Sequence, residues 1–262
     1  MAPAPWRCCS ANPTCNHSLD KLTHSPHGQS VQQMFSQIAH RYNLMNRLMS
    51  AGQDLRWRKV ALQAAGLRPG DTLLDVATGA GDLVFIARSL VPNLRVVAAD
   101  FTVEMMRVGQ GHNDARKQSA GNPPPAHWTA ADTYALPFPS QYFDAVTSAF
   151  LLRNLADPLA GLREQARVLK PAGRLVMLDA TPPPDNLLRP FINLHLNHFI
   201  PLLGKLISSR PDAYRYFPSS VAGFLRPQAI VALFQQVGLQ KIYHRSFMFG
   251  AAALVVGAKP GN

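Results

Sequence analysis

Hydrophobic positions along the chain follow two alternating patterns. Between residues 31 and 45, apolar side chains recur at spacings of three and four, which predicts an amphipathic helix, and residues 57–65 continue with a second one. Beyond residue 70, short apolar runs of strand length alternate with further helical patterns. These runs predict five strands, at residues 72–77, 94–100, 126–132, 142–150 and 174–180.

Helical patterns separate these strands, at residues 82–90, 103–116 and 158–169. Strands that alternate with helices predict an α/β fold with a doubly wound, mostly parallel sheet and right-handed crossovers. The last part of the chain departs from this order, because a helix at 227–237 precedes two strands that meet at Gly250. Such a short connection predicts an antiparallel C-terminal hairpin at the edge of the sheet, which brings the expected total to seven strands.

Two segments fall outside this alternation. Residues 1–30 have no helical or strand period, and we expect a disordered tail there, followed by a helical lid at residues 31–65. Residues 181–225 open with three prolines and continue as a mostly apolar stretch with basic residues at intervals. We interpret them as a cap inserted over the carboxyl ends of the strands, where open α/β folds bind their ligands. A single domain is predicted over residues 31–262.

Composition limits the class of protein. The chain has 26 Lys and Arg against 15 Asp and Glu, and its formal net charge of +11 would favour binding to nucleic acid, an anionic membrane surface or an acidic ligand. The basic residues are scattered, and no stretch interleaves them with aromatic residues, so we expect no nucleic-acid partner. No apolar run reaches the roughly 18 residues needed to span a bilayer.

All three cysteines, Cys8, Cys9 and Cys15, lie near the N-terminus, so the predicted core has none to pair and a reducing cytoplasm is expected. With His17 they offer four soft ligands for zinc. Two of them are adjacent and no C-x-x-C pair occurs, so we predict no metal site. Prolines interrupt every apolar segment of residues 1–30, which argues against a signal peptide. An organellar transit peptide, processing and a misplaced start site remain open for this segment.

The stretch LLDVATGAGDL (73–83) places a buried strand before a small-residue loop and a helix start. Glycine has no Cβ to keep a ligand away from the backbone. A phosphate-binding P-loop would need Gly-Lys-Ser/Thr, a dinucleotide site would have a glycine in place of Val84, and Asp82 would repel a pyrophosphate. S-Adenosylmethionine, a sulfonium cation without phosphate, is the candidate that remains. The predicted cofactor contacts of this stretch are Asp75, Ala77, Gly79, Ala80 and Gly81.

Acidic residues follow the next two predicted strands at the same edge of the sheet. Asp100 ends the second strand, where a carboxylate can accept hydrogen bonds from both ribose hydroxyls. Asp132 ends the third strand and can accept from the adenine amino group. Each of them alone is also explained as a strand-end turn former, so the assignment depends on their joint occurrence. Phe101 and Met105 are candidates to pack on the adenine, with helix packing as the alternative.

Two longer motifs resemble signatures of the ubiquinone/menaquinone biosynthesis C-methyltransferases, class I enzymes that depend on S-adenosylmethionine. YNLMNRLMSAGQDLRW (42–57) is similar to Y-D-x-M-N-x-x-[LIVM]-S-x-x-x-H-x-x-W, and RVLKPAGRLVMLDAT (167–181) to R-V-L-K-P-G-G-x-[LIVMF]-x-x-[LIVM]-E-x-S. The likeness runs over residues 31–259 and includes LLRN (151–154) and DAYRY (212–216). It implies a Rossmann-like class I methyltransferase fold.

Several positions depart from the family pattern, and two of the departures remove side-chain hydrogen bonds that the family makes to its cofactor. These two are Ala80, where the family often has threonine, and Ala149, where a serine is common. The other departures are Asn43 for an acidic residue, Asp54 for histidine, Ala172 for glycine, Asp179 for glutamate, Thr181 for serine, Ser219 for glutamate and Ala222 for arginine.

The resemblance implies transfer of a methyl group from S-adenosylmethionine to a ring carbon of a prenylated hydroquinone, with demethylmenaquinol as the expected acceptor and no metal. It adds Thr133 and Ala149 to the cofactor contacts. Arg153 is expected to hold the developing phenolate and His198 to accept the proton, with Tyr42 as a further catalytic candidate. A methyltransferase of another phenol, polyketide or sterol, and an inactive binding module with the same fold, are the alternatives.

Under this interpretation the apolar cap holds the prenyl tail, and its basic residues contact anionic headgroups at the inner membrane face. A satellite core over the sheet explains each apolar residue equally well. A homodimer is also left open. The expected channel residues are Leu187, Leu188, Phe191, Leu194, Phe199, Ile200, Leu203 and Leu206, and the expected headgroup contacts are Arg189, Lys205 and Arg210.

Overall fold

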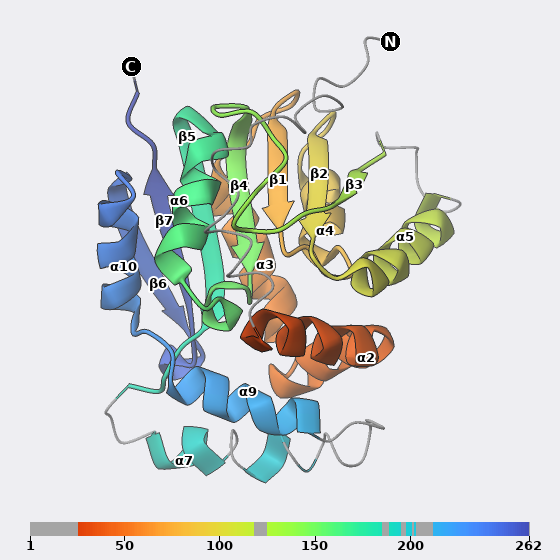
Figure 1. Ribbon diagram of the computed structural model, residues 1–262, viewed down its shortest axis with the longest axis vertical. Coiled ribbons are helices and arrows are strands. Elements are labelled where there is room, and N and C mark those ends of the chain that lie inside the picture. Colours follow the sequence, from red (N-terminus) through yellow and green to blue (C-terminus); the bar gives the residue numbers. More distant parts are fainter. Residues whose placement is uncertain are drawn as a thin grey trace.

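The structure is a computed structural model of the chain, and it describes residues 26–117, 125–184, 189–194, 198–200, 202 and 212–261. Its strands form a seven-stranded sheet in the order β3-β2-β1-β4-β5-β7-β6 (Figure 1). The first five strands are parallel, and β7 is antiparallel to both β5 and β6. The predicted α/β sheet with an antiparallel edge hairpin is therefore confirmed. The strands are β1 (Thr72–Val76), β2 (Arg95–Asp100), β3 (His127–Ala130), β4 (Phe143–Ala149), β5 (Leu169–Ala180), β6 (Gln240–Phe247) and β7 (Ala252–Ala258).

Among the five parallel strands, two boundaries differ from the prediction by more than one residue. β5 begins at Leu169, five residues before the predicted start at residue 174, and the pairing with β4 shifts register within this extension. Pro171 has no amide hydrogen to donate, and Ala172 has a φ of 61°, so the extension is an irregular part of the strand. β3 ends at Ala130, and Asp132 therefore lies beyond the strand.

Successive residues of each central strand face opposite layers. Leu73 packs into a core with α3 and α4, whereas the next residue, Leu74, packs into a second core with α6 and α10. Because both faces are covered, the central strands are mostly apolar, and β1 is buried at every position, including its polar residues Thr72 and Asp75. The helices are α2 (Pro26–Met49), α3 (Gln53–Ala65), α4 (Asp82–Leu90), α5 (Val103–Lys117), α6 (Pro158–Val168), α7 (Arg189–Leu194), α9 (Asp212–Ala222) and α10 (Pro227–Gln236).

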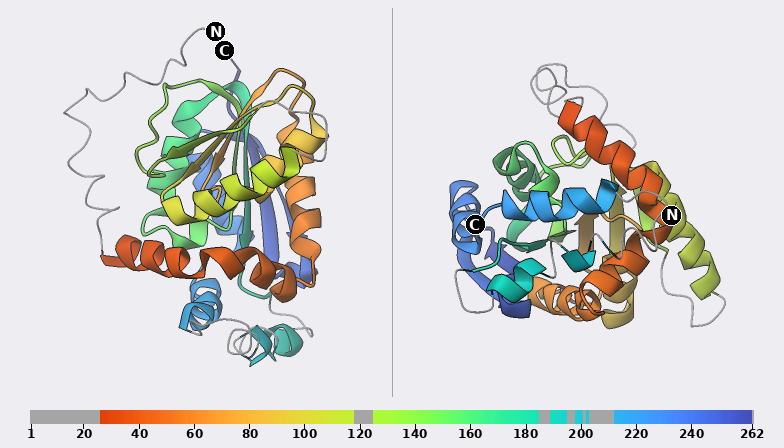
Figure 2. Two further views of the ribbon diagram at one scale, coloured as in Figure 1. Left: turned by 90° about the vertical axis from the view of Figure 1, so that its right-hand side faces the viewer. Right: turned by 90° about the horizontal axis from the view of Figure 1, so that it is seen from below.

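The carboxyl ends of the parallel strands are covered by helices from both ends of the sequence. α2 crosses beneath this edge of the sheet, and α9 and α7 lie on the far side of α2 (Figure 2). α2 begins at Pro26, so residues 26–30 are helical and do not belong to the predicted tail. The lid and the cap are thus neighbours in space although more than 110 residues separate them in the sequence.

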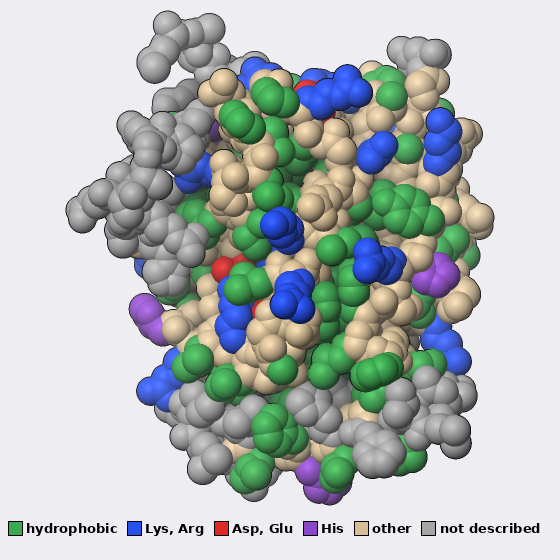
Figure 3. Space-filling view, turned by 180° about the vertical axis from the view of Figure 1, so that it is seen from behind, with side chains coloured by type: hydrophobic (Ala, Val, Ile, Leu, Met, Phe, Trp, Pro, Cys, Tyr) green, Lys and Arg blue, Asp and Glu red, His purple; other side chains and the backbone are tan. Residues whose placement is uncertain are grey.

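Several predictions fall outside the described residues. They are the tail over residues 1–25, with its cysteines and His17, and the cap residues Leu187, Leu188, Leu203, Lys205, Leu206 and Arg210. On the face shown in Figure 3, basic side chains are dispersed between hydrophobic and uncharged ones, as the sequence predicted. None of the described helices combines the length and the hydropathy that a membrane-spanning segment needs.

Candidate active site

The loop between β1 and α4 turns sharply and packs closely against its neighbours. Ala77, Gly79 and Gly81 have φ values of 54°, 57° and 80°, in the left-handed region. A Cβ on Gly81 would lie 2.5 Å from a ring atom of Trp128 in β3, and one on Gly109 in α5 would lie 2.8 Å from the Ala80 carbonyl oxygen. Glycine is therefore required at both positions, and it lets the loop backbone sit tightly at the strand ends.

Asp75 lies beneath this loop and not in a pocket wall. Its two carboxylate oxygens accept hydrogen bonds from the hydroxyls of Thr78 at 2.7 Å and Thr147 at 2.8 Å. Burial raises the pKa of Asp75 to about 6, although both hydroxyls act in the opposite direction. The carboxylate therefore shapes the turn from below, and it does not line the pocket described below.

Asp100 joins the end of β2 to the glycine loop. One carboxylate oxygen accepts from the Gly79 amide at 2.6 Å, and the other accepts from the Thr102 amide at 2.7 Å. Burial also raises its pKa to about 6, against these hydrogen bonds. Each oxygen has a second lone pair. The side chain lines the pocket described next, so it can accept ribose hydroxyls there.

A pocket at the carboxyl ends of β1, β2 and β4 collects most of the predicted cofactor contacts. Asp132 stands at one end of it, with Oδ1 accepting from the Tyr134 amide at 2.9 Å. The predicted residues in its wall are Tyr42, Ala77, Gly79, Ala80, Asp100, Phe101, Met105, Asp132, Thr133 and Ala149. The predicted residues outside its wall are Asp75, Gly81, Arg153 and His198.

We call this pocket the donor pocket, because it gathers most of the contacts predicted for the methyl donor. Helix α2 closes it and supplies wall residues that the sequence analysis did not assign. Gln32 Nε2 donates to the carbonyl of Phe101 at 3.1 Å, and Ser36 Oγ donates to Glu104 at 3.0 Å, so α2 is fastened to the start of α5. Val31 and Phe35 also line this pocket. They belong to the apolar stripe of α2, which the sequence explains equally well as core packing, so they were not predicted as pocket residues. Other residues that were missed include Arg58, Thr78, Asp82, Tyr134 and Asn154.

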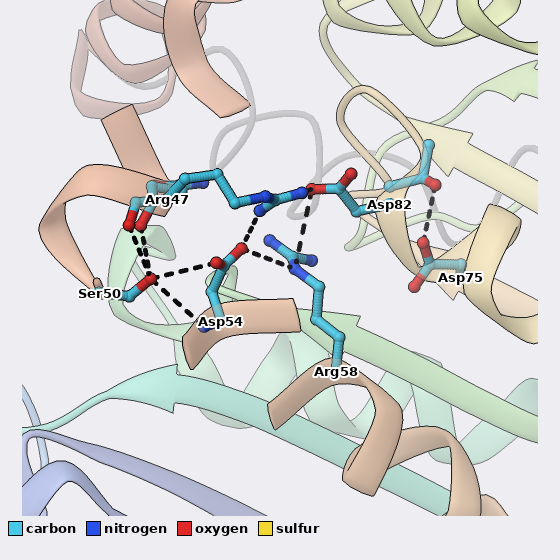
Figure 4. A network of polar contacts seen from close by, with 8 residues as sticks. Arg47, Ser50, Asp54, Arg58, Asp75 and Asp82 are labelled. Atoms are coloured by element: carbon cyan, nitrogen blue, oxygen red, sulfur yellow. Dashed lines mark hydrogen bonds and ion pairs between the residues drawn. The ribbon is translucent and has the colours of Figure 1, made fainter. Parts of the chain in front are cut away.

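Four charged side chains lie between α2, α3 and α4 beside this pocket (Figure 4). Arg47 pairs with both Asp54 and Asp82, at 3.0 Å to the latter. Ser50 Oγ donates to Asp54 at 3.1 Å. Arg58 extends from α3 to a position between the two aspartates. Asp54, where the family signature has histidine, is thus the buried centre of an ion-pair network.

A second pocket adjoins the first, and Phe150 is part of both walls. It has a cavity volume of about 320 Å³ and is mainly apolar. Its aromatic and aliphatic walls come from segments that are distant in sequence. Its polar side chains are Asn46, Ser50, Asp54 and Arg153, and its apolar ones are Met49, Trp57, Phe150, Ala180, Ile192, Ile200, Phe217, Met248, Phe249, Ala251 and Ala252.

Arg153 is the buried cation of this second pocket. It lies in the short 3-10 helix η2 (Leu152–Asn154), and Nη1 donates to Asp179 Oδ1 at 2.6 Å and to the carbonyl of Phe150 at 3.1 Å. The rings of Phe150 and Phe217 flank the guanidinium at 5.7 and 5.3 Å, and Nε is buried without a hydrogen-bond partner. Burial is the largest single influence and lowers the pKa of Arg153, but the charge of Asp179, its hydrogen bond to Arg153 and the nearby Tyr42 and Tyr216 together raise this pKa above its usual value. The side chain therefore stays a cation.

The other two predicted catalytic residues lie apart. Tyr42 is in the wall of the donor pocket, and it also lines a small cavity of about 30 Å³ together with Arg153 and Tyr216. His198 is exposed and lies in neither pocket wall. Among the residues that the structure describes, no three His, Cys, Asp or Glu side chains are grouped as metal ligands.

Comparison with known proteins shows the family of this chain. A sequence model of the ubiE/COQ5 methyltransferase family matches residues 23–259. The chain belongs to this family. It is therefore a methyltransferase, and the match supports S-adenosylmethionine as its methyl donor.

Curated relatives of this methyltransferase span nearly the same length. A demethylmenaquinone methyltransferase of Thermus thermophilus is 41% identical over 227 residues, which cover 87% of this chain and 100% of the relative. A ubiquinone/menaquinone biosynthesis C-methyltransferase UbiE of Desulfotalea psychrophila is 38% identical over 232 residues, with coverages of 88% and 91%.

A solved structure supports the fold. The phosphoethanolamine N-methyltransferase 2 of Haemonchus contortus, in complex with phosphomonomethylethanolamine and S-adenosylhomocysteine, superposes with a TM-score of 0.56 at 15% identity. The match covers 78% of this methyltransferase and 52% of that chain. At this identity the likeness concerns the class I methyltransferase architecture alone.

The first signature has a structural explanation in this methyltransferase. It spans the end of α2 and the start of α3, and its members line both pockets. Tyr42 and Asn43 face the donor pocket, whereas Asn46, Asp54 and Trp57 face the apolar one. The second signature spans β5, and near the end of this strand Asp179 forms an ion pair with Arg153. The signatures therefore place residues at the junction of the two pockets.

Proposed function

We propose that this methyltransferase transfers the methyl group of S-adenosylmethionine to a ring carbon of a prenylated hydroquinone, with demethylmenaquinol as acceptor. The observation that carries the proposal is the apolar pocket that contains the buried Arg153 guanidinium and shares Phe150 with the donor pocket. An aromatic hydroquinone ring that ionises at one of its two hydroxyls matches such a wall. The names of the curated relatives, which specify menaquinone and ubiquinone biosynthesis, point to the same acceptor class.

In this proposal the donor lies along the strand ends with its adenine near Asp132 and Thr133 and its ribose hydroxyls on Asp100. Phe101 and Met105 pack beside the adenine, and the glycine loop lies beneath the remainder. The sulfonium then faces Phe150 and the second pocket. The transferred methyl group and the acceptor carbon must approach to about 3–3.5 Å with water excluded, and the apolar walls of the second pocket suit both requirements.

The proposed chemistry depends on the electron density of the ring. Loss of the hydroxyl proton gives a phenolate, whose adjacent ring carbon attacks the methyl group while the sulfur–carbon bond breaks. The products are S-adenosylhomocysteine and a methylated ring, which then loses the proton from the attacked carbon. Arg153 stabilises the phenolate as a fixed cation in an apolar wall, where a charge interaction is stronger than in water.

His198 remains our proposed proton acceptor, on the strength of the sequence resemblance. Its exposed position outside both pocket walls makes the substitution His198→Ala the first test of this assignment. Full turnover by this variant, with unchanged donor binding, would remove His198 from the mechanism. Tyr42, which lines the donor pocket and the small cavity next to Arg153, is then the candidate to examine.

We further propose that the cap contacts a membrane that supplies the prenylated acceptor. Three of its large apolar side chains are exposed, Leu194 at 58%, Phe199 at 45% and Leu202 at 54%. Exposed apolar side chains on a cap over the acceptor pocket suit contact with lipid. Flotation with anionic vesicles tests this, because absence of salt-sensitive binding would contradict the proposed contact.

The proposed reaction is tested by incubating the full chain with methyl-labelled S-adenosylmethionine and a short-chain demethylmenaquinol under reducing conditions. We expect labelled, methylated quinol. Parallel incubations with other phenols, a polyketide and a sterol compare the acceptor classes. Arg153→Lys keeps the charge but not the planar donor geometry, and we expect its turnover to fall by about 10²–10³ without loss of donor affinity. Labelling of another acceptor in preference to the quinol would overturn the proposal.

A further inference from the structure

Arg58 is a buried cation that the proposed methyl transfer does not use. Its side chain is 6% exposed, and its guanidinium lies 5.1 Å from the centre of the Phe150 ring. Nε is buried without a hydrogen-bond partner. The nearest carboxylate oxygens, on Asp54 and Asp82, are 3.7 and 3.8 Å from Nε, too far for hydrogen bonds.

The two aspartates do not depend on Arg58 for their hydrogen bonds. Arg47 donates to both of them, and Ser50 donates to the second oxygen of Asp54. A guanidinium with a free buried donor costs folding free energy unless a ligand completes its bonds. Arg58 and Asp82 are both in the wall of the donor pocket, so such a ligand has access to them.

The order of residues along the donor pocket indicates which part of the ligand reaches Arg58. With adenine at Asp132 and ribose at Asp100, the remaining α-amino acid head extends past the glycine loop toward α3 and α4. That head carries one carboxylate and one ammonium. The wall there presents the guanidinium of Arg58 and the carboxylate of Asp82. Figure 4 shows that these two groups lie next to each other.

We propose that Arg58 binds the carboxylate of the donor's amino acid head and that Asp82 accepts from its ammonium group. This inference rests on S-adenosylmethionine as the donor and does not depend on the acceptor. A guanidinium forms charge-assisted and often bidentate hydrogen bonds with a carboxylate. The side chain is held in place beforehand by the Phe150 ring and by the two aspartates, so little conformational entropy is lost on binding.

The test is a binding cycle on the full chain without acceptor, measured by calorimetry. S-Adenosylmethionine is compared with decarboxylated S-adenosylmethionine, which lacks only the carboxylate, in the wild type and in Arg58→Met. We expect the wild type to prefer the intact donor by about ten- to hundredfold, and Arg58→Met to lose most of this preference. Asp82→Asn should weaken both ligands, because both carry the ammonium group.

Controls separate this role from a structural one. 5′-Methylthioadenosine has the adenosine but no amino acid head, and its affinity should be unchanged in Arg58→Met. Arg56→Met removes the same charge from an exposed position on the same helix and should leave every affinity unchanged. Equal losses for all three ligands, or an unchanged preference for the carboxylate, would overturn the inference. A wild type that binds the donor but does not methylate quinol would contradict only the proposed acceptor.

Discussion

Arg153 and Asp179 form a buried ion pair between the 3-10 helix after β4 and the end of β5. Nη1 and Oδ1 are 2.6 Å apart, and the two side chains are 5% and 0% exposed. The Arg153 amide also donates to the second Asp179 oxygen at 3.1 Å. Asp179 thus holds both the backbone amide and the guanidinium of Arg153, the residue that we propose stabilises the phenolate.

Removing Asp179 leaves this cation buried without its partner. We expect Asp179→Ala to lower the free energy of unfolding by about 3–5 kcal/mol, which urea denaturation measures. Lys170→Met is the control, because it removes a partly exposed ion pair with Asp144 and should change stability by less than about 1 kcal/mol. Equal effects of the two substitutions would show that the Arg153–Asp179 pair is not specially important for stability.

Asp75 predicts a pH dependence of stability. Its pKa is raised to about 6 in the folded protein, whereas an aspartate in the unfolded chain titrates near 3.9. Between these values the folded state binds more protons than the unfolded state, so stability falls as the pH rises from about 4 to about 6. The loss from this residue is about 2 kcal/mol.

Asp75→Asn removes that titration. We expect its free energy of unfolding to vary less across this range than that of the wild type, as measured by denaturation at several pH values. Asp100, whose pKa is also about 6, keeps part of the dependence in the variant. A wild type and variant with parallel pH profiles would contradict the assignment to Asp75.

The tight packing of the glycine loop can be tested with a pair of alanine substitutions. Gly81→Ala combines a left-handed φ of 80° with a Cβ 2.5 Å from Trp128, and we expect a loss of about 2–4 kcal/mol in stability together with weaker donor binding. Gly52 has a similar φ of 74° and no atom within 4 Å of an added Cβ. Gly52→Ala should therefore lose only about 1 kcal/mol. A similar loss in both variants would leave no role for the contact with Trp128.

Because the two pockets are proposed to bind different substrates, we expect substitutions of two aromatic residues to affect different substrates. Phe217 on α9 lines the larger apolar pocket and the small cavity beside it but not the donor pocket, whereas Phe101 lines the donor pocket but not the apolar one. We expect Phe217→Ala to raise the KM for the quinol by about tenfold or more and to leave donor affinity unchanged. Phe101→Ala should weaken the donor instead. Steady-state kinetics with each substrate varied in turn measure both. A rise in donor KM alone for Phe217→Ala would contradict the assignment of the acceptor pocket.

The sheet was predictable because its strands carry the required pattern locally. Leu73 and Leu74 face different cores, so a strand covered on both sides is apolar at most positions, and this pattern can be recognised in the sequence alone. The extension of β5 was missed because Pro171 and Ala172 interrupt it. The start of α2 was missed because residues 26–30 carry no apolar stripe.

The candidate site was predictable where chemistry and strand ends coincide, as at Asp100 and Asp132. Arg58 was missed because an arginine four residues after Asp54 on a helix normally forms a surface ion pair. Its burial depends on α2 and α4, which only the folded chain brings together. Arg153 and Ile200 are the predicted residues that line the second pocket, and most of its other walls were missed for the same reason, since Trp57, Phe217 and Met248 come from three distant segments.

Helix α2 has a consequence for the order of events in turnover. It contributes Gln32 and Phe35 to the donor pocket and Asn46 and Met49 to the acceptor pocket, and Gln32 and Ser36 fasten it to the start of α5. A single rigid helix cannot move away from one pocket without disturbing the other. Any movement of α2 that opens the donor pocket to release S-adenosylhomocysteine therefore also changes the wall of the second pocket. We expect release of this product and binding of the proposed acceptor to be coupled.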